Sequence, residues 1–277
     1  MKMIAIGDNV VDCYLDQEKF YPGGNCVNVA VNCKRSGAED VSYIGIFATD
    51  GKAAHIKYAL DQEQVDYSRS RVVEGISGSP QVNLTKEGDR VFVGGPKNTV
   101  QHIVKLKLIQ EDYDYIKNFD LCHTSCYSSF EEELPGLSKH IKISFDFSDK
   151  YTPEYLGKVC PFISHGFFSG AHLSEEELEA LIAELGKYEL EVIGITRGAK
   201  PALFINNGNR YYKEVVETDI IDTMGAGDSF IAGFLTAFTN QAGMESALEF
   251  AAKRASITCG YYGGFGYPKE MEYHPSK

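Results

Sequence analysis

The chain has 277 residues, of which 43% are hydrophobic and 24% are charged, a composition typical of a globular protein with a large core. Its formal net charge of −12 argues against binding to the phosphate backbone of nucleic acid, which requires a basic surface. No apolar run is long enough to span a bilayer, and residues 1–7 are too short for the core of a signal peptide. We therefore expect a cytoplasmic protein with no nucleic-acid or membrane partner.

Strand-like and helix-like patterns alternate along the chain. The expected strands cover residues 3–7, 41–47, 120–124, 143–147, 166–169, 192–196 and 202–205. Helical patterns cover 25–36 and 53–60, and the clearest helix follows Ser174, which forms a capping box with Glu177. Strands that alternate with helices predict an α/β fold with a doubly wound, mostly parallel sheet covered on both faces. We expect residues 1–277 to form one domain.

Two segments interrupt this alternation. Residues 75–95 contain two expected strands, 80–84 and 90–93, joined by a turn with typical hairpin residues. Residues 13–21 are short, polar and extended. The two segments form either a small side sheet on the α/β body or two surface hairpins without a function, and periodicity does not decide between these alternatives.

The seven cysteines are scattered and odd in number, which does not fit the disulfide framework of a small secreted domain. Cys122 and Cys126 suggest a metal site, but no second pair with suitable spacing follows them. Reduced thiols that pack beside the end of a strand are the favoured interpretation. We therefore assign no metal-ligating residue.

The segment 222–228 has the sequence Asp-Thr-Met-Gly-Ala-Gly-Asp and continues into an apolar, helical pattern. The first N–H groups of a helix lack partners within the helix, and together with the helix dipole they form a site for an anion such as phosphate. Asp228 follows at a position where a carboxylate can take a proton from an attacking hydroxyl. Phosphoryl transfer is one interpretation; a glycine-containing turn with an aspartate N-cap is the other, and the segment alone favours neither.

A second glycine cluster, Pro-Gly-Gly-Asn-Cys-Val-Asn-Val-Ala, covers residues 22–30 just before and within an expected helix. Gly23 and Gly24 permit close approach of a ligand to the backbone, and the Asn28 amide offers both a donor and an acceptor. Alone, this cluster is better explained as a turn and a helix with one solvated asparagine. The glycine-rich run 263–266 is not a dinucleotide fingerprint, because no strand and helix follow it.

Two further polar turns follow expected strands. Asp8 and Asp12 come after the first strand, where carboxylates suit the neighbouring hydroxyls of a sugar, because ligands bind outside the carboxyl ends of parallel strands. Thr196 and Gly198 follow a later strand and offer hydroxyl and backbone donors to a nucleotide. Each turn by itself is more simply a solvated loop.

In combination and in order, these four segments resemble the ribokinase-like (PfkB) carbohydrate kinases, over residues 4 to about 266. The most specific piece is 222–234. Within that family, five segments look most like the fructoselysine 6-kinases: 7–12, 25–30, 89–92, 145–150 and 221–224.

The resemblance implies a ribokinase-like fold with a small β-sheet lid, built from the segments near 13–21 and 75–95. It implies ATP-dependent phosphorylation of a sugar hydroxyl, most simply the 6-hydroxyl of fructoselysine. By this resemblance Asp228 is the catalytic base, and the anion hole and the nucleotide-binding residues are Gly225, Ala226, Gly227, Thr196 and Gly198. The resemblance gives Asp12, Gly24 and Asn28 as sugar contacts, to which the expected substrate-binding set adds Asp8, Gly23 and Arg90.

Side-chain chemistry suggests how the lysine part of the substrate would be bound. Arg90, if it lies on the lid, would pair with the carboxylate, and Asp8 or Asp149 would face an amine. The resemblance also implies Mg²⁺ with the ATP and, in some members, a monovalent cation such as K⁺ near Asp222. A segment with which the family often organises Mg²⁺ is replaced here by 169–172, Ser-Gly-Ala-His, so the metal is expected to be carried by ATP.

Several alternatives remain open from the sequence. Another kinase of the same family would act on fructose, a different fructosamine or a nucleoside. A non-catalytic sugar or nucleotide sensor would use the same scaffold, although such a protein should have lost the base or the glycines, and both are intact here. Lid strands expose edges that would allow a homodimer.

Overall fold

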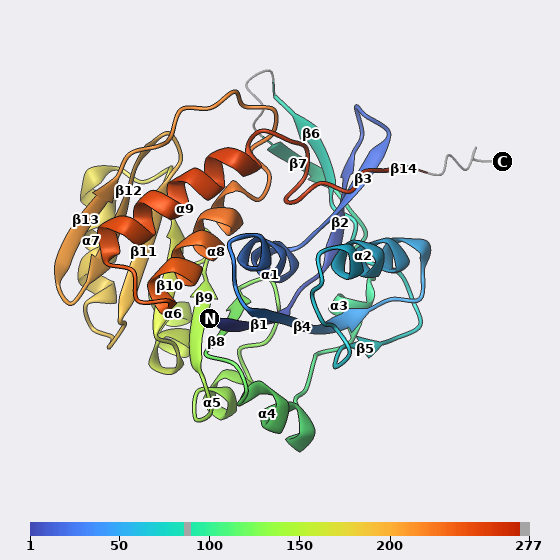
Figure 1. Ribbon diagram of the computed structural model, residues 1–277, viewed down its shortest axis with the longest axis horizontal. Helices are drawn as coiled ribbons and strands as arrows, with labels where there is room; N and C mark the ends of the chain where they lie inside the picture. Colours follow the sequence, from blue (N-terminus) through green and yellow to red (C-terminus); the bar gives the residue numbers. More distant parts are fainter. Residues whose placement is uncertain (86–89, 272–277) are drawn as a thin grey trace.

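The computed structural model describes residues 1–85 and 90–271, and its largest element is a mostly parallel sheet (Figure 1). The strands of this sheet are β1 (Lys2–Gly7), β4 (Asp40–Phe47), β5 (Arg71–Val72), β8 (Leu121–Ser125), β9 (Lys142–Asp146), β10 (His165–Ser169), β11 (Val192–Arg197), β12 (Lys200–Asn206) and β13 (Asn209–Lys213). They lie side by side in the order β13-β12-β11-β10-β9-β8-β1-β4-β5. The α/β fold with a mostly parallel sheet is therefore confirmed.

The expected strands are all present, with ends that shift by one or two residues. The sequence analysis missed β5 and β13, which are short or largely exposed and lack the apolar pattern of a buried strand. It also gave no sign that β12 runs antiparallel to β11. A tight turn at Gly198, with φ of +63°, joins β11 to β12, and such a short connection permits only antiparallel pairing.

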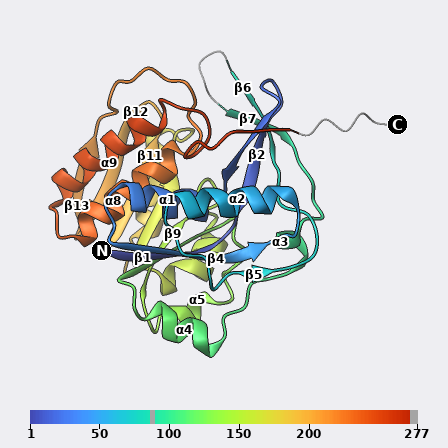
Figure 2. The ribbon, with the colours of Figure 1, turned by 45° about the vertical axis from the view of Figure 1, so that its right-hand side comes forward.

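Helices cover both faces of the large sheet. The helices are α1 (Asn25–Arg35), α2 (Gly51–Gln62), α3 (Val100–Ile103), α4 (Gln110–Ile116), α5 (Leu134–Leu137), α6 (Pro153–Val159), α7 (Glu175–Leu185), α8 (Ala226–Thr239) and α9 (Met244–Thr258), with a 3₁₀ turn at Cys160–Phe162. In Figures 1 and 2, α1, α2, α8 and α9 lie together on one face, and Figure 1 shows α6 and α7 on the other. The capping box expected before α7 is present, since Ser174 and Glu177 exchange backbone-to-side-chain hydrogen bonds of 2.8 and 3.2 Å.

The two segments that interrupted the alternation form one small sheet, at the upper right of Figure 1. Its strands are β2 (Val10–Tyr14), β3 (Lys19–Gly23), β6 (Gln81–Leu84), β7 (Arg90–Gly94) and β14 (Lys269–Glu270), in the order β14-β3-β2-β6-β7. Parallel pairing of Cys13 with Gln81 joins the two hairpins, so the alternative of unrelated surface hairpins is wrong. The first segment begins at Val10 rather than at residue 13, and most of the expected turn, 86–89, lies outside the described residues.

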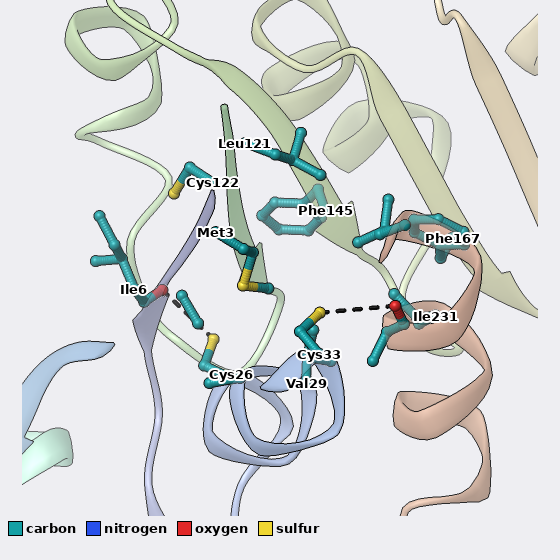
Figure 3. Packing of buried hydrophobic residues seen from close by; sticks show 14 of the residues in the cluster. Met3, Ile6, Cys26, Val29, Cys33, Leu121, Cys122, Phe145, Phe167 and Ile231 are labelled. Carbon is teal, nitrogen blue, oxygen red and sulfur yellow. Dashed lines mark hydrogen bonds between the residues drawn. The ribbon is translucent and has the colours of Figure 1, made fainter. Parts of the chain in front are cut away.

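Helix α1 is joined to β1 and to α8 by hydrogen bonds from two buried cysteines (Figure 3). Its Cys26 and Cys33 are fully buried, and their thiols donate to the carbonyl oxygens of Ile6 in β1 (3.4 Å) and Ala232 in α8 (3.6 Å). All seven cysteines are free thiols, and Cys122 is buried in the core, as expected for a packing residue. In the described part of the chain, no three His, Cys, Asp or Glu residues cluster so as to hold a metal ion.

No helix among the described residues combines the length and the apolar character needed to cross a membrane.

The buried aromatic cluster around Phe234 in α8 generates a stability prediction. Its ring is fully buried and lies 4.8 Å from that of Phe204 and 5.2 Å from that of Phe238. Phe234→Ala leaves a cavity, so we expect the free energy of unfolding to fall by about 3–5 kcal/mol in urea titrations. The matched control is Phe92→Ala, whose side chain is 56% exposed on β7 and whose loss should leave the stability nearly unchanged. Equal losses in the two variants would contradict this description of the core.

Candidate active site

Polar residues gather where β1, β8 and β9 end and where α1 and α8 begin. These three strands are parallel neighbours, so their carboxyl ends lie at one edge of the sheet. After β1, the next strand of this sheet, β4, lies on one side of β1, and the later strand β8 lies on the other side. The strand order therefore reverses at β1, and its carboxyl end is the topological switch point. Ligands of open α/β sheets bind in the crevice at such a point.

The loop before α8 is shaped by its glycines. Gly225 is the N-cap residue, with φ of +72°, and a Cβ there would lie 2.5 Å from Cα of Gly264. Gly227 is exposed in the first turn of α8, and a Cβ there would meet nothing within 4 Å. The amide of Ala226 donates to the carbonyl oxygen of Thr223 at 3.2 Å, so it is engaged within the loop. The start of α8 thus presents its positive end to a surface that Gly227 leaves open.

Asp222 ties this loop to the small sheet. Its buried carboxylate accepts hydrogen bonds from the Tyr14 hydroxyl (2.5 Å) and from the amides of Gly263 (2.8 Å) and Met224 (2.9 Å). Burial, with the negative charge of Asp222 alongside, raises the pKa of Tyr14 and keeps its hydroxyl protonated as the donor. The glycine run 263–266, which the sequence excluded only as a dinucleotide fingerprint, therefore lies against the loop and forms part of its support.

The Asp228 carboxylate is held by two amides from α1. Its Oδ1 accepts from Nδ2 of Asn25 at 2.8 Å, and its Oδ2 accepts from Nδ2 of Asn28 at 2.7 Å. Asn25 and Asn28 are three residues apart and so lie on the same face of α1. Asp228 is only partly buried, and each carboxylate oxygen can accept more than one hydrogen bond. The carboxylate is thus oriented and still accessible.

Asn25, which the sequence analysis did not single out, bridges two acids. Its Nδ2 also donates to Oδ2 of Asp146 at 2.7 Å, and its Oδ1 lies 3.0 Å from Nε2 of His123. Burial raises the pKa of Asp146 to about 7, with a further contribution from the negative charge of Asp228. The signal that could have found Asn25 is its spacing from Asn28 in an expected helix.

The structure gives Asp8 an anchoring position. Its carboxylate accepts from the amides of Asn25 (2.7 Å) and Cys26 (3.4 Å) and from the hydroxyls of Ser125 and Ser128 (both 3.1 Å). Gly24, the N-cap residue of α1, has no side chain that could accept hydrogen bonds from the first amides of the helix. Asp8 therefore stabilises the start of the helix that carries the two asparagines, a role the sequence did not indicate.

Asp12 and Gly23 lie on the adjacent strands β2 and β3. A Cβ on Gly23 would come within 2.2 Å of Oδ2 of Asp12, so the glycine makes room for that buried carboxylate. At Gly24, φ is +100° and a Cβ would lie 2.9 Å from Cα of Asn9. The expected sugar contacts are thereby brought to one region, next to Asn28. Arg90 begins β7 opposite Leu84, but its side chain lies outside the described part of the structure.

The expected nucleotide residues lie farther along the same edge. Thr196 and Gly198 are at the carboxyl end of β11, which β9 and β10 separate from β8. The Thr196 hydroxyl donates to the carbonyl oxygen of Phe168 at 3.4 Å, and Gly198 is exposed in its turn. In the nearby segment 169–172, His172 lies 3.2 Å from the Tyr151 hydroxyl.

The family model and the similar proteins that the chain matches are all carbohydrate kinases. Over residues 2–140 and 166–269, the chain matches the family described as pfkB family carbohydrate kinase. It is 47% identical over 274 residues to the fructosamine kinase FrlD of Bacillus subtilis (strain 168), with coverage of 98% of this chain and 96% of the relative. It is 31% identical over 270 residues to the fructoselysine 6-kinase of Escherichia coli (strain K12), with coverage of 96% and 100%.

Solved structures show the same fold at low sequence identity. An Arabidopsis thaliana ribokinase complexed with ribose and ATP superposes with a TM-score of 0.79 at 17% identity, covering 95% of this chain and 93% of that one. A putative ribokinase II from E. coli in complex with ATP and Mg²⁺ gives a TM-score of 0.77, again at 17% identity, with coverage of 95% and 94%. With the family match over most of its length, the chain belongs to the PfkB family of carbohydrate kinases.

Proposed function

We propose that this kinase transfers the γ-phosphoryl group of ATP to a fructosamine, most specifically to the 6-hydroxyl of fructoselysine. The observation that carries the proposal is the Asp228 carboxylate, which α1 orients through two amides beside the glycine loop at the start of α8. The choice of a fructosamine is supported by relatives that are named fructosamine kinase and fructoselysine 6-kinase.

In the proposed reaction, Asp228 accepts the proton of the sugar hydroxyl while the hydroxyl oxygen attacks the γ-phosphorus of ATP. The bond between the γ-phosphorus and the bridging oxygen breaks, and ADP leaves. Backbone amides of Gly225 and Gly227 and the positive end of α8 stabilise the charge on the phosphoryl group during transfer. Asp12 and Asn28 orient the sugar hydroxyls. Thr196 and Gly198 line the nucleotide.

We assign Mg²⁺ to the ATP phosphates, where it would neutralise their charge. The donor set fits this assignment, because the described residues offer no cluster of three or more acidic, histidine or cysteine ligands and Mg²⁺ keeps several waters. A monovalent cation near Asp222 stays a prediction, as does dimerisation through the edges of the small sheet. Both oxygens of Asp222 are engaged by protein donors, so the structure adds no support for the cation.

The small sheet is the proposed lid over the sugar. Asp8 uses its carboxylate to anchor α1, whereas Asp149 is exposed at the same edge, three residues beyond Asp146. Of the two acids expected to face a substrate amine, the structure therefore favours Asp149. Arg90 remains the proposed partner of the substrate carboxylate.

The proposed base is tested by Asp228→Asn, which keeps the size of the side chain and removes its basicity. We expect kcat to fall by about a hundredfold to ten-thousandfold, the usual contribution of a general base, while sugar binding measured by calorimetry changes little. Glu245→Gln is the control, because Glu245 is, like Asp228, an acid in the first turn of a helix, but its side chain is exposed and lies on α9 rather than at the start of α8. Substantial activity in Asp228→Asn would rule out the assignment.

A pair of alanine variants distinguishes the structural role of Gly225 from the ligand-binding role proposed for Gly227. Gly225→Ala places a Cβ 2.5 Å from Gly264 at a positive φ, so we expect the free energy of unfolding to fall by about 1–3 kcal/mol. Gly227→Ala meets no protein atom within 4 Å, so stability should be unchanged, while the KM for ATP rises or kcat falls as the methyl group obstructs the phosphate. A fully active Gly227→Ala enzyme would contradict the proposed anion site.

The substrate is tested with a coupled assay of ADP release on fructoselysine, another fructosamine, fructose and a nucleoside. We expect the highest kcat/KM for fructoselysine. Asp149→Asn should lower kcat/KM for fructoselysine and leave that for fructose nearly unchanged, since fructose has no amine. A clear preference for free fructose or for the nucleoside would favour one of the other kinase activities, and no turnover of any sugar would favour a sensor.

A further inference from the structure

His123 is a buried histidine that the proposed reaction does not use. It lies in β8 directly opposite Ser144 of β9, and its side chain is inaccessible to solvent. Its Nδ1 lies 2.9 Å from the Ser144 hydroxyl, and its Nε2 lies 3.0 Å from Oδ1 of Asn25. Burial lowers the pKa of His123 to about 3, so the ring is neutral at physiological pH, with one donor and one acceptor nitrogen.

The neighbours of Asn25 permit only one direction for this chain of hydrogen bonds. The carboxyl groups of Asp146 and Asp228 face one end of the Asn25 amide, and Asp228, which is ionised in its proposed role as the base, only accepts. The Nδ2 end must therefore point at them and Oδ1 at His123, whose Nε2 must carry the proton. The remaining nitrogen, Nδ1, accepts from the Ser144 hydroxyl.

Without the histidine donor, the Asn25 amide is held at its Nδ2 end alone. Oδ1 of Asn25, which faces β8, would lose its hydrogen-bond donor. A buried acceptor without a donor destabilises the arrangement that contains it. Displacement or rotation of the amide then no longer sacrifices a bond to His123, and any such movement weakens the donor to Asp228.

We propose that His123 is a positioning residue of the kinase: through Asn25 it fixes the donor that orients the Asp228 carboxylate, and Ser144 in turn fixes the tautomer of His123. This inference rests on the proposed role of Asp228 as the base. The four side chains come from β8, β9, α1 and α8, so the network joins the sheet to both helices at the site.

The test compares His123→Phe with His123→Gln. Phenylalanine removes the donor, and we expect kcat to fall by about tenfold to a hundredfold, the range for the loss of a hydrogen bond to a charged group, with a much smaller change in the KM for sugar. Glutamine can donate from Nε2 to Asn25 and should restore kcat to within about threefold of the wild type. Thr124→Val is the matched control on the same strand, because the Thr124 hydroxyl is buried and without a partner among the described residues.

The pH profile supplies a readout that a packing defect would not change. Loss of a donor to a carboxylate raises the pKa of that group, and the base must be ionised to act, so the acid limb of kcat/KM should move to higher pH by about one unit in His123→Phe. The titratable groups that face the network are Asp8, Cys26, Asp146 and Asp228. The shift should persist in an Asp146→Asn background, because it belongs to Asp228.

The outcomes separate this inference from the proposed function. Wild-type kcat and pH profile in a folded His123→Phe protein, or equal losses in His123→Phe and Thr124→Val, would overturn the role of His123 and leave the kinase assignment intact. If His123→Phe does not fold, Ser144→Ala should give a smaller loss in the same direction, and no loss would overturn the proposal.

If the wild-type protein phosphorylates no sugar, the proposed function fails, and the network is still tested by the tautomer of His123. Nitrogen-15 NMR of the histidine rings, assigned by comparison with His123→Gln, should show the proton on Nε2, and a proton on Nδ1 would overturn the inferred network.

Discussion

The two hydrogen bonds from α1 to the Asp228 carboxylate are the interaction on which the site depends. They join the helix that follows the first hairpin of the small sheet to the helix that follows the glycine loop, about two hundred residues later in the chain. Both helices are packed into the core: the Cys26 thiol joins α1 to β1, the Cys33 thiol joins α1 to α8, and α8 also packs through its aromatic cluster. A partly exposed carboxylate is thereby held in one orientation by rigid elements on either side.

Negative charge gathers at this edge of the sheet, where Asp8, Asp146 and Asp228 lie close together in a protein that is already acidic. Each carboxylate is compensated differently. Asp8 accepts two amides at the start of α1 and two hydroxyls; Asp228 accepts two asparagine donors; and the buried Asp146 has a raised pKa. Amide donors and a helix N-terminus thus stabilise the negative charge without a cationic side chain.

Glycines set the close approaches between these elements. Gly23 admits the Asp12 carboxylate, Gly225 admits the segment around Gly264, and each would collide with its neighbour if it carried a Cβ. Gly227 has no such protein neighbour, so packing within the protein does not require a glycine there. The sequence showed these glycines as equivalent members of two motifs, and their different tasks follow from what surrounds them in three dimensions.

The sequence by itself determined the α/β class, nearly every strand of the large sheet, the capping box of α7 and the loop that carries Asp228, because these depend on periodicity and on local turn chemistry. The antiparallel pairing of β12 follows from the tight turn at Gly198, a local feature that the sequence analysis missed. Only the tertiary structure decided the parallel pairing that unites two hairpins in one small sheet, the anchoring position of Asp8, and the bridge from His123 through Asn25 to Asp228. Those features depend on hydrogen bonds between residues far apart in the chain, and a single residue's identity does not specify its distant partner.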